Sequence, residues 1–323
     1  MRRGATGLCG VLAIDKPAGI TSHDVVDRVR RITGERRVGH AGTLDPMATG
    51  LMLVGVGAAT RLSQYLTGHD KTYEARIVFG ACTDTDDALG SIIASEQLSG
   101  PGQNLSVLEG IDSHDEVQRL VGSSQQLPPA YSAIKKDGVT AYRAAREGKQ
   151  LELEPRAITV HAATLRDTGT LEAVLDDGRG GQFEGALPYW DVELSVSKGT
   201  YIRSIARDLG LKLGCGAYLG ALRRTAIAGF PVERACTLEQ LQEAVHAGDE
   251  LPWCDPAELL GFPVRVLDEA QAAAVSCGKA FAGEAGAPFV SCVAGGKLVA
   301  VYRPEDGQLR PATVIPGGVS GAR

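Results

Sequence analysis

The sequence predicts an α/β protein that ends in a small β-rich unit. Residues 71–80 and 191–197 alternate apolar and polar side chains with the period of a strand. Residues 23–33 instead place valines on one face and arginines on the other, which is the pattern of an amphipathic helix. At 323 residues the chain is long enough for one large domain and a smaller one.

Composition places the chain among ordinary globular proteins, with 44% apolar and 22% charged residues. Seven cysteines without a Cys-x-x-Cys pair argue against the usual zinc spacings and a disulfide framework, and favour a reducing cytoplasm. The short apolar stretch near the start lacks the features of a signal peptide. No run approaches the roughly 20 apolar residues that a membrane helix needs.

The net charge of -6 argues mildly against nucleic acid as a partner, because phosphate contacts require Lys and Arg. The basic residues are nevertheless unevenly distributed, and a local basic face can exist on an acidic protein. Two solvated helix faces would give the same pattern. The two basic groups are Arg28, Arg30, Arg31, Arg36 and Arg37, and then Lys198, Arg203, Arg207, Lys212, Arg223 and Arg224.

The first predicted elements are a strand, a helix and a buried strand. Residues 9–14 form the strand, and Ser22 occupies the N-cap position of a helix that ends at Gly34. A turn rich in Gly and Pro at 39–50 leads into the apolar run 51–56, which predicts a buried strand.

That turn displays one carboxylate, Asp45. The glycines around it allow backbone conformations that other residues resist, and Pro46 fixes the direction in which the chain leaves the acid. An Asp-Pro pair most often closes a turn or caps the next segment. The alternative is a positioned nucleophile.

The middle of the chain offers three further features. Tyr73 lies on the core face of the strand at 71–80, where packing is its ordinary role. The acidic segment 83–90 predicts a turn and capping network, because it lacks the distal Glu of a calcium loop. Residues 126–136 contain Tyr131, Lys135 and Lys136, and Tyr142, Arg143 and Arg146 follow, so that aromatic residues are interleaved with Lys and Arg. This pattern suits an element that grips RNA, although a surface hairpin and helix would look much the same.

The second half begins with an acidic, Gly-rich insertion at 167–185, which predicts a hairpin extension without an assigned role. The strand at 191–197 then leads into a helix that starts near Thr200, and Tyr201 and Arg203 lie at its entrance. A side chain where a strand is followed by a helix is often functional. Thr237 and Gln240 predict a capping box for the next helix. The β-rich unit follows, with a helix at 269–277 and strands at 289–293 and 298–302 joined by Gly295-Gly296.

Several of these segments resemble, in a fixed order, the motifs of the TruB family of tRNA pseudouridine synthases. Gly-His-Ala-Gly-Thr-Leu-Asp-Pro-Met-Ala-Thr-Gly at 39–50 and Ser-Lys-Gly-Thr-Tyr-Ile-Arg at 197–203 are the most specific matches. Others are the Asp-Lys-Pro segment within 12–22, Lys-x-Tyr at 71–73 and Leu-Arg-Arg within 216–225. The resemblance covers roughly residues 10–245, and the β-rich tail looks like a PUA domain.

The resemblance implies an α+β pseudouridine synthase fold, in which helices flank a mixed, largely antiparallel central sheet. It implies a catalytic domain at 1–250 with a thumb-like RNA-binding segment at about 122–153, a linker at 251–262, a PUA-like domain at 263–316 and a tail at 317–323.

The resemblance also implies site roles. Asp45 is the nucleophile, Arg203 its cationic partner, Tyr73 stacks on the target base, and Tyr201 assists proton removal from C5. His40 enters the space that the flipped base leaves, and Leu222 forms the apolar floor. The remaining substrate-binding residues are Lys16, Arg36, Arg37, Lys198, Arg207, Arg223 and Arg224.

The implied reaction is the isomerisation of uridine 55 in the T loop of tRNA, by a cytoplasmic monomer without cofactor or metal. Whether Asp45 attacks C1′ of the sugar or C6 of uracil stays open. One alternative is a hydrolase, which would need a second carboxyl group at about 5 Å from Asp45. The other is an RNA-binding protein without catalytic activity, in which Asp45→Asn would leave all activity intact.

Overall fold

The computed structural model describes residues 6–94, 100–132, 134–136, 138–147, 149, 151–283 and 286–322. The side chains of Tyr142 and Arg146, predicted to contact RNA, lie outside the described part. Contacts divide the chain into two compact units. The terminal unit runs up to His69 and again from Ala226, and the central unit spans Asp70–Thr225.

The terminal unit is built on short antiparallel strands. Strand β1 (Gly10–Lys16) pairs with β3 (Thr49–Val56), and β2 (Val38–Ala41) also pairs with β3. Strand β14 (Trp253–Cys254) pairs with β1. The predicted buried strand is confirmed, because every residue of β3 after Thr49 is buried.

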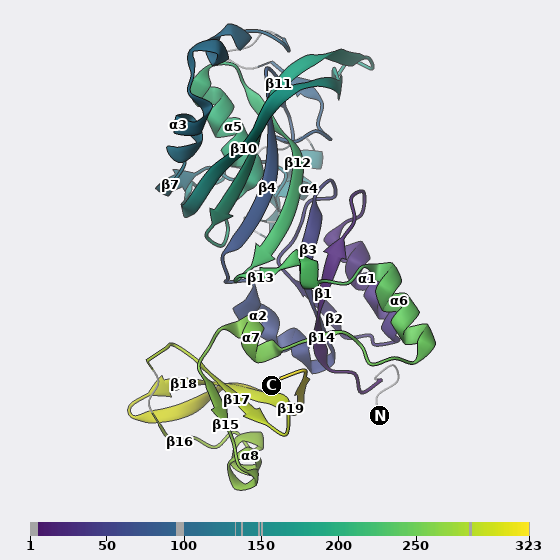
Figure 1. Ribbon diagram of the computed structural model, residues 1–323, viewed down its shortest axis with the longest axis vertical. Helices are drawn as coiled ribbons and strands as arrows, with labels where there is room; N and C mark the ends of the chain where they lie inside the picture. The colour runs from purple at the N-terminus through teal and green to yellow at the C-terminus, as the bar shows by residue number, and fades with distance from the viewer. Residues whose placement is uncertain are drawn as a thin grey trace. The chain divides into compact units, whose positions relative to one another are not determined.

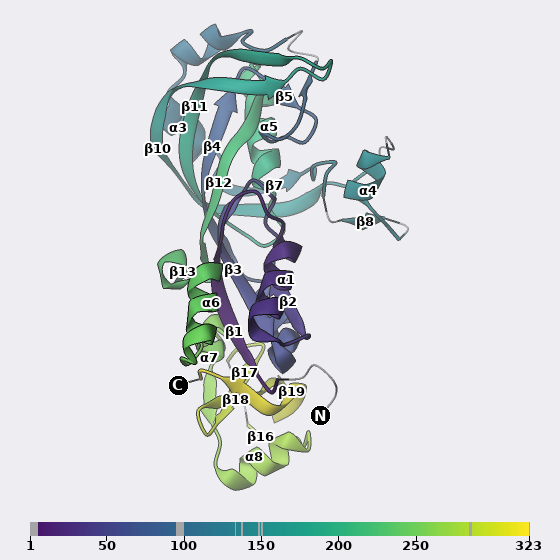
Figure 2. The same cartoon turned by 90° about the vertical axis from the view of Figure 1, so that its right-hand side faces the viewer.

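Two helices of this unit pack against each other, as Figure 2 shows. Helix α1 (Ser22–Thr33) ends at Gly34 in the left-handed conformation, as predicted. Its N-cap is Thr21, however, and not Ser22 as predicted, because the Thr21 hydroxyl accepts from the backbone N–H of Asp24 while the Ser22 hydroxyl points to another part of the chain. Helix α6 (Leu238–Ala247) has the predicted capping box.

The C-terminal residues form the predicted β-rich unit, a sheet ordered β15-β17-β18-β19-β16 with helix α8 (Glu269–Ser276). Its strands are β15 (Val264–Val266), β16 (Phe281–Ala282), β17 (Val290–Ala294), β18 (Lys297–Glu305) and β19 (Gln308–Ser320). Two of the expected boundary segments contain regular structure. The expected linker contains β14 and helix α7 (Pro256–Leu260), whose apolar side chains are buried. The expected tail begins inside β19, where Val319 is buried.

The first and last parts of the chain share one hydrophobic core. Leu51 and Leu62 pack in the same cluster as Leu298 and Val319. At its edge, short helices η1 (Gly57–Leu62) and α2 (Ser63–Leu66) present Tyr65, whose ring lies 5.1 Å from that of Phe289. The β-rich unit is therefore packed on the N-terminal strands.

Five strands of the central unit lie in one sheet in the order β12-β4-β11-β10-β7, and Figure 1 shows their twisted course. Antiparallel pairings join β4 to β11, β11 to β10 and β10 to β7, in line with the largely antiparallel sheet that was predicted. The strands are β4 (Lys71–Phe79), β7 (Gly122–Gln126), β10 (Arg156–Asp176), β11 (Gln182–Val196) and β12 (Ala217–Ile227).

The predicted insertion at 167–185 is the outer half of the β10–β11 hairpin, whose pairing continues to Asp176 and Gln182. Ala173, Leu175 and Phe183 of this extension pack with Ile92 and other residues beside the acidic segment. The extension thus covers the loop between β5 and β6. The small elements of that region are β5 (Cys82–Thr83), β6 (Ile92–Ile93), η2 (Leu105–Gly110) and α3 (Ser113–Gln118).

The segment predicted to grip RNA contains a short hairpin, β8 (Lys135–Lys136) and β9 (Val139–Thr140), followed by helix α4 (Ala141–Arg146). Figure 2 shows α4 and β8 standing apart from the strands of the central unit. Helix α5 (Ile202–Leu213) packs against β4. Among the described residues, no helix is long and apolar enough to cross a membrane.

Candidate active site

Asp45 lies in the loop that joins the paired strands β2 and β3. Gly42 and Gly50 flank this loop with φ angles of 102° and 105°, in the region that strains any residue with a Cβ. Asp45 is half-buried, and its carbonyl accepts a hydrogen bond of 3.1 Å from the Ala48 N–H. The two glycines therefore have the conformational role that the sequence predicted.

Ser22 holds the residue immediately before Asp45. Its Oγ accepts from the Leu44 N–H at 2.8 Å and donates to the Leu44 carbonyl at 3.0 Å. Both residues are only 4% exposed, so water does not compete well for these bonds. A single hydroxyl thus fixes both backbone polar groups next to the acid.

Lys16 holds the other side of the loop. Its Nζ donates to the carbonyls of Pro46 at 3.3 Å, Ala48 at 2.6 Å and Pro17 at 2.9 Å. The Gly19 N–H also donates to the Pro46 carbonyl, at 2.9 Å. Lys16 is fully buried, so its predicted role as a phosphate contact does not fit this position. Its ammonium group instead holds the loop backbone at Pro46 and Ala48.

In the central unit, Tyr73 is 7% exposed on β4, on the same face as the buried Ala75 and Ile77. Lys71 begins this strand, and burial, followed by the nearby charge of Arg224, lowers its pKa to about 8. Arg224 has no exposed surface. Its predicted role as a phosphate contact therefore does not fit this position either, because an anion cannot reach a fully buried guanidinium.

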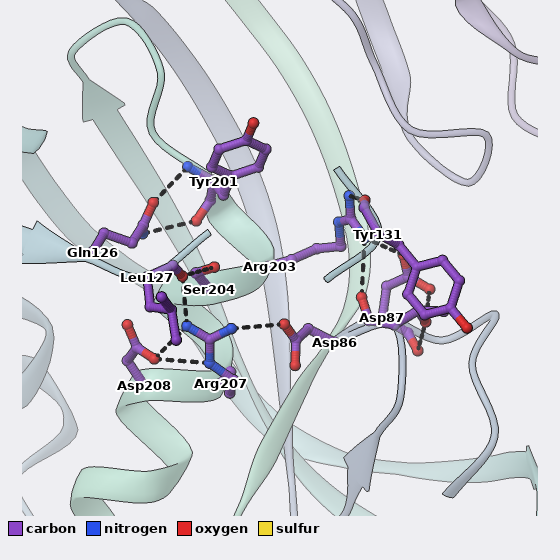
Figure 3. Close-up of polar contacts among 11 residues, drawn as sticks. Asp86, Asp87, Gln126, Leu127, Tyr131, Tyr201, Arg203, Ser204, Arg207 and Asp208 are labelled. Carbon is purple, nitrogen blue, oxygen red and sulfur yellow. Dashed lines mark hydrogen bonds and ion pairs between the residues drawn. The ribbon is translucent and has the colours of Figure 1, made fainter. Parts of the chain in front are cut away.

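Helix α5 begins where predicted, with Ile202, Ile205 and Leu209 buried. Tyr201 is its N-cap, and the side chain of Gln126 holds the backbone of that residue. Gln126 Oε1 accepts from the Tyr201 N–H at 2.9 Å, and Nε2 donates to the Tyr201 carbonyl at 3.0 Å (Figure 3).

Arg203 lies in the first turn of α5 and is 5% exposed. Its guanidinium donates to the carbonyls of Thr85 at 3.0 Å and Tyr131 at 2.9 Å, and lies 3.6 Å from the Asp87 carboxylate (Figure 3). Asp87 Oδ1 in turn accepts from the Thr85 hydroxyl at 2.7 Å and the Leu89 N–H at 3.0 Å. The acidic segment is thus the turn network that its sequence predicted, and it holds Arg203.

Arg207 lies one turn further along α5 and contacts the same segment. It forms an ion pair of 2.9 Å with Asp86 and donates to the Leu127 carbonyl at 2.8 Å (Figure 3). Burial raises the pKa of Asp86 to about 6, although Arg207 and Arg203 act in the opposite direction. Asp86 also has a φ of 60°, uncommon for a residue with a side chain.

The other predicted residues are distributed over both units. His40 lies on β2 opposite Val54, and Arg37 donates to the Thr60 hydroxyl at 2.8 Å. Arg36 and Lys198 are exposed. Leu222 is 8% exposed on β12, next to the half-buried Arg223. Lys16, Arg36, Arg37, His40 and Asp45 belong to the terminal unit, and Tyr73, Lys198, Tyr201, Arg203, Arg207, Leu222, Arg223 and Arg224 to the central unit.

Two residues with a clear place in this geometry were missed from the sequence, Ser22 and Gln126. Thr21 and Ser22 can both cap a helix, and the sequence assigns the N-cap to Ser22. That assignment leaves no other partner for the Ser22 hydroxyl. Gln126 precedes Leu-Pro-Pro and carried no signal beyond the segment that contains it. Among the described residues, no group of three or more His, Cys, Asp or Glu side chains is arranged to hold a metal ion.

Comparison with known proteins places the chain in a family. Residues 30–202 match the model of the TruB family pseudouridylate synthase N-terminal domain, and residues 203–258 match that of the tRNA pseudouridylate synthase B C-terminal domain. Proteins named tRNA pseudouridine synthase B from Thermobifida fusca (strain YX) and Mycobacterium tuberculosis (strain ATCC 25618 / H37Rv) are each 41% identical over 95% of this chain, and 99% and 98% of their own lengths are covered.

A solved Cbf5-Nop10-Gar1 complex contains a chain of the same fold. The TM-score is 0.63 at 23% identity, and the match covers 95% of this chain and 84% of that one. These matches with related sequences exclude both alternatives, the hydrolase and the RNA-binding protein without catalytic activity. The chain belongs to the TruB family of pseudouridylate synthases and is therefore a pseudouridine synthase, an isomerase.

Proposed function

We propose that this enzyme isomerises uridine to pseudouridine in the T loop of tRNA, at uridine 55, with Asp45 as the nucleophile. The full-length relatives named tRNA pseudouridine synthase B support tRNA as the substrate. The observation that carries the role of Asp45 is the fixation of its loop by Ser22 and Lys16. A nucleophile that must meet one atom of a base or sugar benefits from a backbone that is already in position.

The reaction needs no cofactor in this proposal. The bond between N1 and C1′ breaks, C5 becomes bonded to C1′, the proton on C5 leaves, and N1 ends with a proton. Atoms and electrons therefore balance without a redox partner. A carboxylate can carry such a reaction through a covalent intermediate at either C1′ or C6.

The target uridine must leave its stack before Asp45 can reach it, at a cost of a few kcal/mol that is smaller in a loop than in a duplex. Stacking on Tyr73 would return about 1–3 kcal/mol. His40 fills the space that the base leaves, and Arg203 keeps Asp45 ionised, because a neighbouring guanidinium favours the charged carboxylate. Tyr201 assists removal of the C5 proton.

The basic residues supply the electrostatic contacts to the tRNA in this proposal. Arg36, Arg37, Lys198, Arg207 and Arg223 bind phosphates, and Leu222 forms the floor under the base. Residues 1–250 act as the catalytic domain, with 122–153 as the thumb-like segment that grips RNA. Residues 263–316 act as a PUA-like RNA-binding domain. The enzyme works as a monomer in the cytoplasm, where its free cysteines stay reduced.

The test is release of tritium from a tRNA transcript labelled at C5 of uracil. Wild type should release the label of one uridine per tRNA, and a transcript with cytidine at position 55 should release none. Asp45→Asn should lose at least about 10⁴-fold in rate while it still binds the transcript. If Asp45→Asn releases tritium as fast as wild type, the nucleophile is another residue. Release from the transcript that lacks uridine 55 would place the target elsewhere in the tRNA.

A further inference from the structure

Gln126 is built into the structure as a partner of the Tyr201 backbone. It is 3% exposed, and both ends of its amide are used, by the Tyr201 N–H at 2.9 Å and the Tyr201 carbonyl at 3.0 Å. The amide therefore binds residue 201 as a neighbouring strand would. Two parallel bonds to one residue fix its rotation as well as its distance, which a single bond does not.

The backbone of Gln126 belongs to the sheet of the central unit. Gln126 is the last residue of β7, and its backbone is registered opposite Arg156 of β10. Through Gln126, the position of Tyr201 is therefore fixed relative to the sheet of the central unit. Tyr201 lies after the end of β11 and is the N-cap of α5, so its carbonyl also accepts the first bond of the helix, from the Ile205 N–H at 3.2 Å. Its N–H lies outside the regular bonds of the helix and donates to Gln126.

The residues that follow Gln126 are joined to the same helix. The Leu127 carbonyl accepts from Ser204 Oγ at 2.9 Å and from Arg207 at 2.8 Å, and the Tyr131 carbonyl accepts from Arg203 at 2.9 Å (Figure 3). Segment 126–131 and the first two turns of α5 thus share several bonds. Of these contacts, only those of Gln126 reach the backbone of Tyr201.

We propose that Gln126 is a positioning residue for the reaction, which sets the direction of the Tyr201 side chain through the Tyr201 backbone. The proposal rests on the proposed function, in which Tyr201 acts in the chemical step. Without the two bonds, Tyr201 stays at the N-cap of α5, but the direction of its side chain is less well fixed. A displacement of about 1 Å at a reacting group can cost about 100-fold in rate.

The experiment compares Gln126→Met, Tyr201→Ala and the double variant with the wild-type enzyme on the tritiated tRNA transcript, in single turnover at saturating enzyme. Methionine keeps the length of glutamine and removes both hydrogen bonds. Gln126→Met should lower the rate constant by about 10- to 100-fold and leave the Kd for tRNA within about threefold. In the Tyr201→Ala background the same change should lower the rate by less than about twofold, because the group that it aims is gone.

Gln118→Met is the matched control. Gln118 also donates from its amide to a backbone carbonyl at 2.6 Å, but its partner is Ala163 of β10 and not a residue of α5. Its replacement should leave the rate constant unchanged. Gln126→Glu keeps the acceptor for the Tyr201 N–H and loses the donor to the Tyr201 carbonyl. It replaces the methionine variant if that variant does not fold. It too should lower the rate constant only in the enzyme that retains Tyr201.

The outcomes separate this inference from the proposed function. An active Gln126→Met enzyme, or a rate loss that is equally large with and without Tyr201, overturns the positioning role while pseudouridine formation stands. Full activity of Tyr201→Ala also overturns it, again without affecting the reaction itself. A wild-type enzyme that forms no pseudouridine overturns both.

Discussion

The Asp45 loop and the start of helix α5 each hold predicted catalytic residues, but different forces fix them. The loop is held by donors that bind backbone groups directly, the Ser22 hydroxyl, the Lys16 ammonium and the Gly19 N–H. On α5, Arg203 and Arg207 are held in part by the carboxylates of Asp87 and Asp86. The loop depends on hydrogen bonds to backbone groups, whereas the α5 region combines such bonds with ion pairs.

Because of this difference, the two regions should respond differently to pH and to salt. Bonds from a hydroxyl or a backbone N–H to buried backbone groups do not titrate, and the ordinary pKa of a lysine ammonium lies far above the range in which carboxylates titrate. Buried bonds are also little affected by salt. Ion pairs between carboxylates and guanidinium groups depend on the protonation of the acid, and a partly exposed pair also depends on ionic strength. We therefore expect pH and salt to act on the α5 region and to leave the geometry of the Asp45 loop unchanged.

The largest effect is expected from Lys16→Met. The change leaves three carbonyl groups around the loop without their common donor, and the free energy of unfolding should fall by about 3–5 kcal/mol. Urea unfolding of both proteins measures this loss. Lys279→Met, at an exposed lysine of the β-rich unit, should stay within about 0.5 kcal/mol of wild type. Equal midpoints for Lys16→Met and Lys279→Met would mean that the ammonium does not hold the loop.

Asp86→Asn probes the charged region through pH. Burial raises the pKa of Asp86 from 3.8 to about 6, so the folded protein takes up a proton where the unfolded chain does not. The contribution of Asp86 to the free energy of unfolding therefore falls as pH rises from about 4 to about 6 and is constant above that range. Relative to wild type, Asp86→Asn should gain at most about 3 kcal/mol across this window.

Thermal unfolding of both proteins at several pH values gives this difference. Arg207, Arg203 and Asp208 are the charged groups that affect the pKa of Asp86 and are unchanged in the variant. A difference in unfolding free energy that does not vary between pH 4 and pH 6 would show that Asp86 titrates at its ordinary value. The charges of Arg207 and Arg203 would then offset the effect of burial.

A smaller effect on stability, but a specific one on rate, is expected from Ser22→Ala. Loss of the hydroxyl removes both bonds to Leu44, so we expect about 1–2 kcal/mol of destabilisation and about a tenfold lower single-turnover rate at unchanged Kd for tRNA. Thr21→Ala is the neighbouring control, because it removes the N-cap of α1 at a cost of about 1 kcal/mol. If both variants keep the wild-type rate, the two hydrogen bonds between Ser22 and Leu44 contribute to stability and not to the reaction.

The same comparison shows what the sequence could predict. Local patterns identified β3, α1 and α5 and placed Asp45 in a Gly-flanked turn, because hydrophobic periodicity and turn chemistry are properties of neighbouring residues. The roles of Ser22, Lys16 and Gln126 depend on partners 22, 32 and 75 positions away in the chain. Side chains that bind a distant backbone leave no periodic signal. The sequence therefore predicts phosphate contacts for Lys16 and Arg224, because the charge of a side chain is visible in the sequence and its burial is not.

The smallest expected effect comes from Asp208→Asn, which sharpens the comparison within one ion network. Asp208 binds the same guanidinium as Asp86, at 2.8 Å, but its side chain is 46% exposed while that of Asp86 is 14% exposed. An exposed pair is stabilising by less than about 1 kcal/mol, so unfolding at neutral pH should change little. Asp208 also raises the pKa of Asp86, so its removal should shift the pH window of the Asp86 effect downward. A shift without a change in neutral-pH stability would show that Asp208 acts on the pH response through its charge beside Asp86, and not through the stability of its own exposed pair with Arg207.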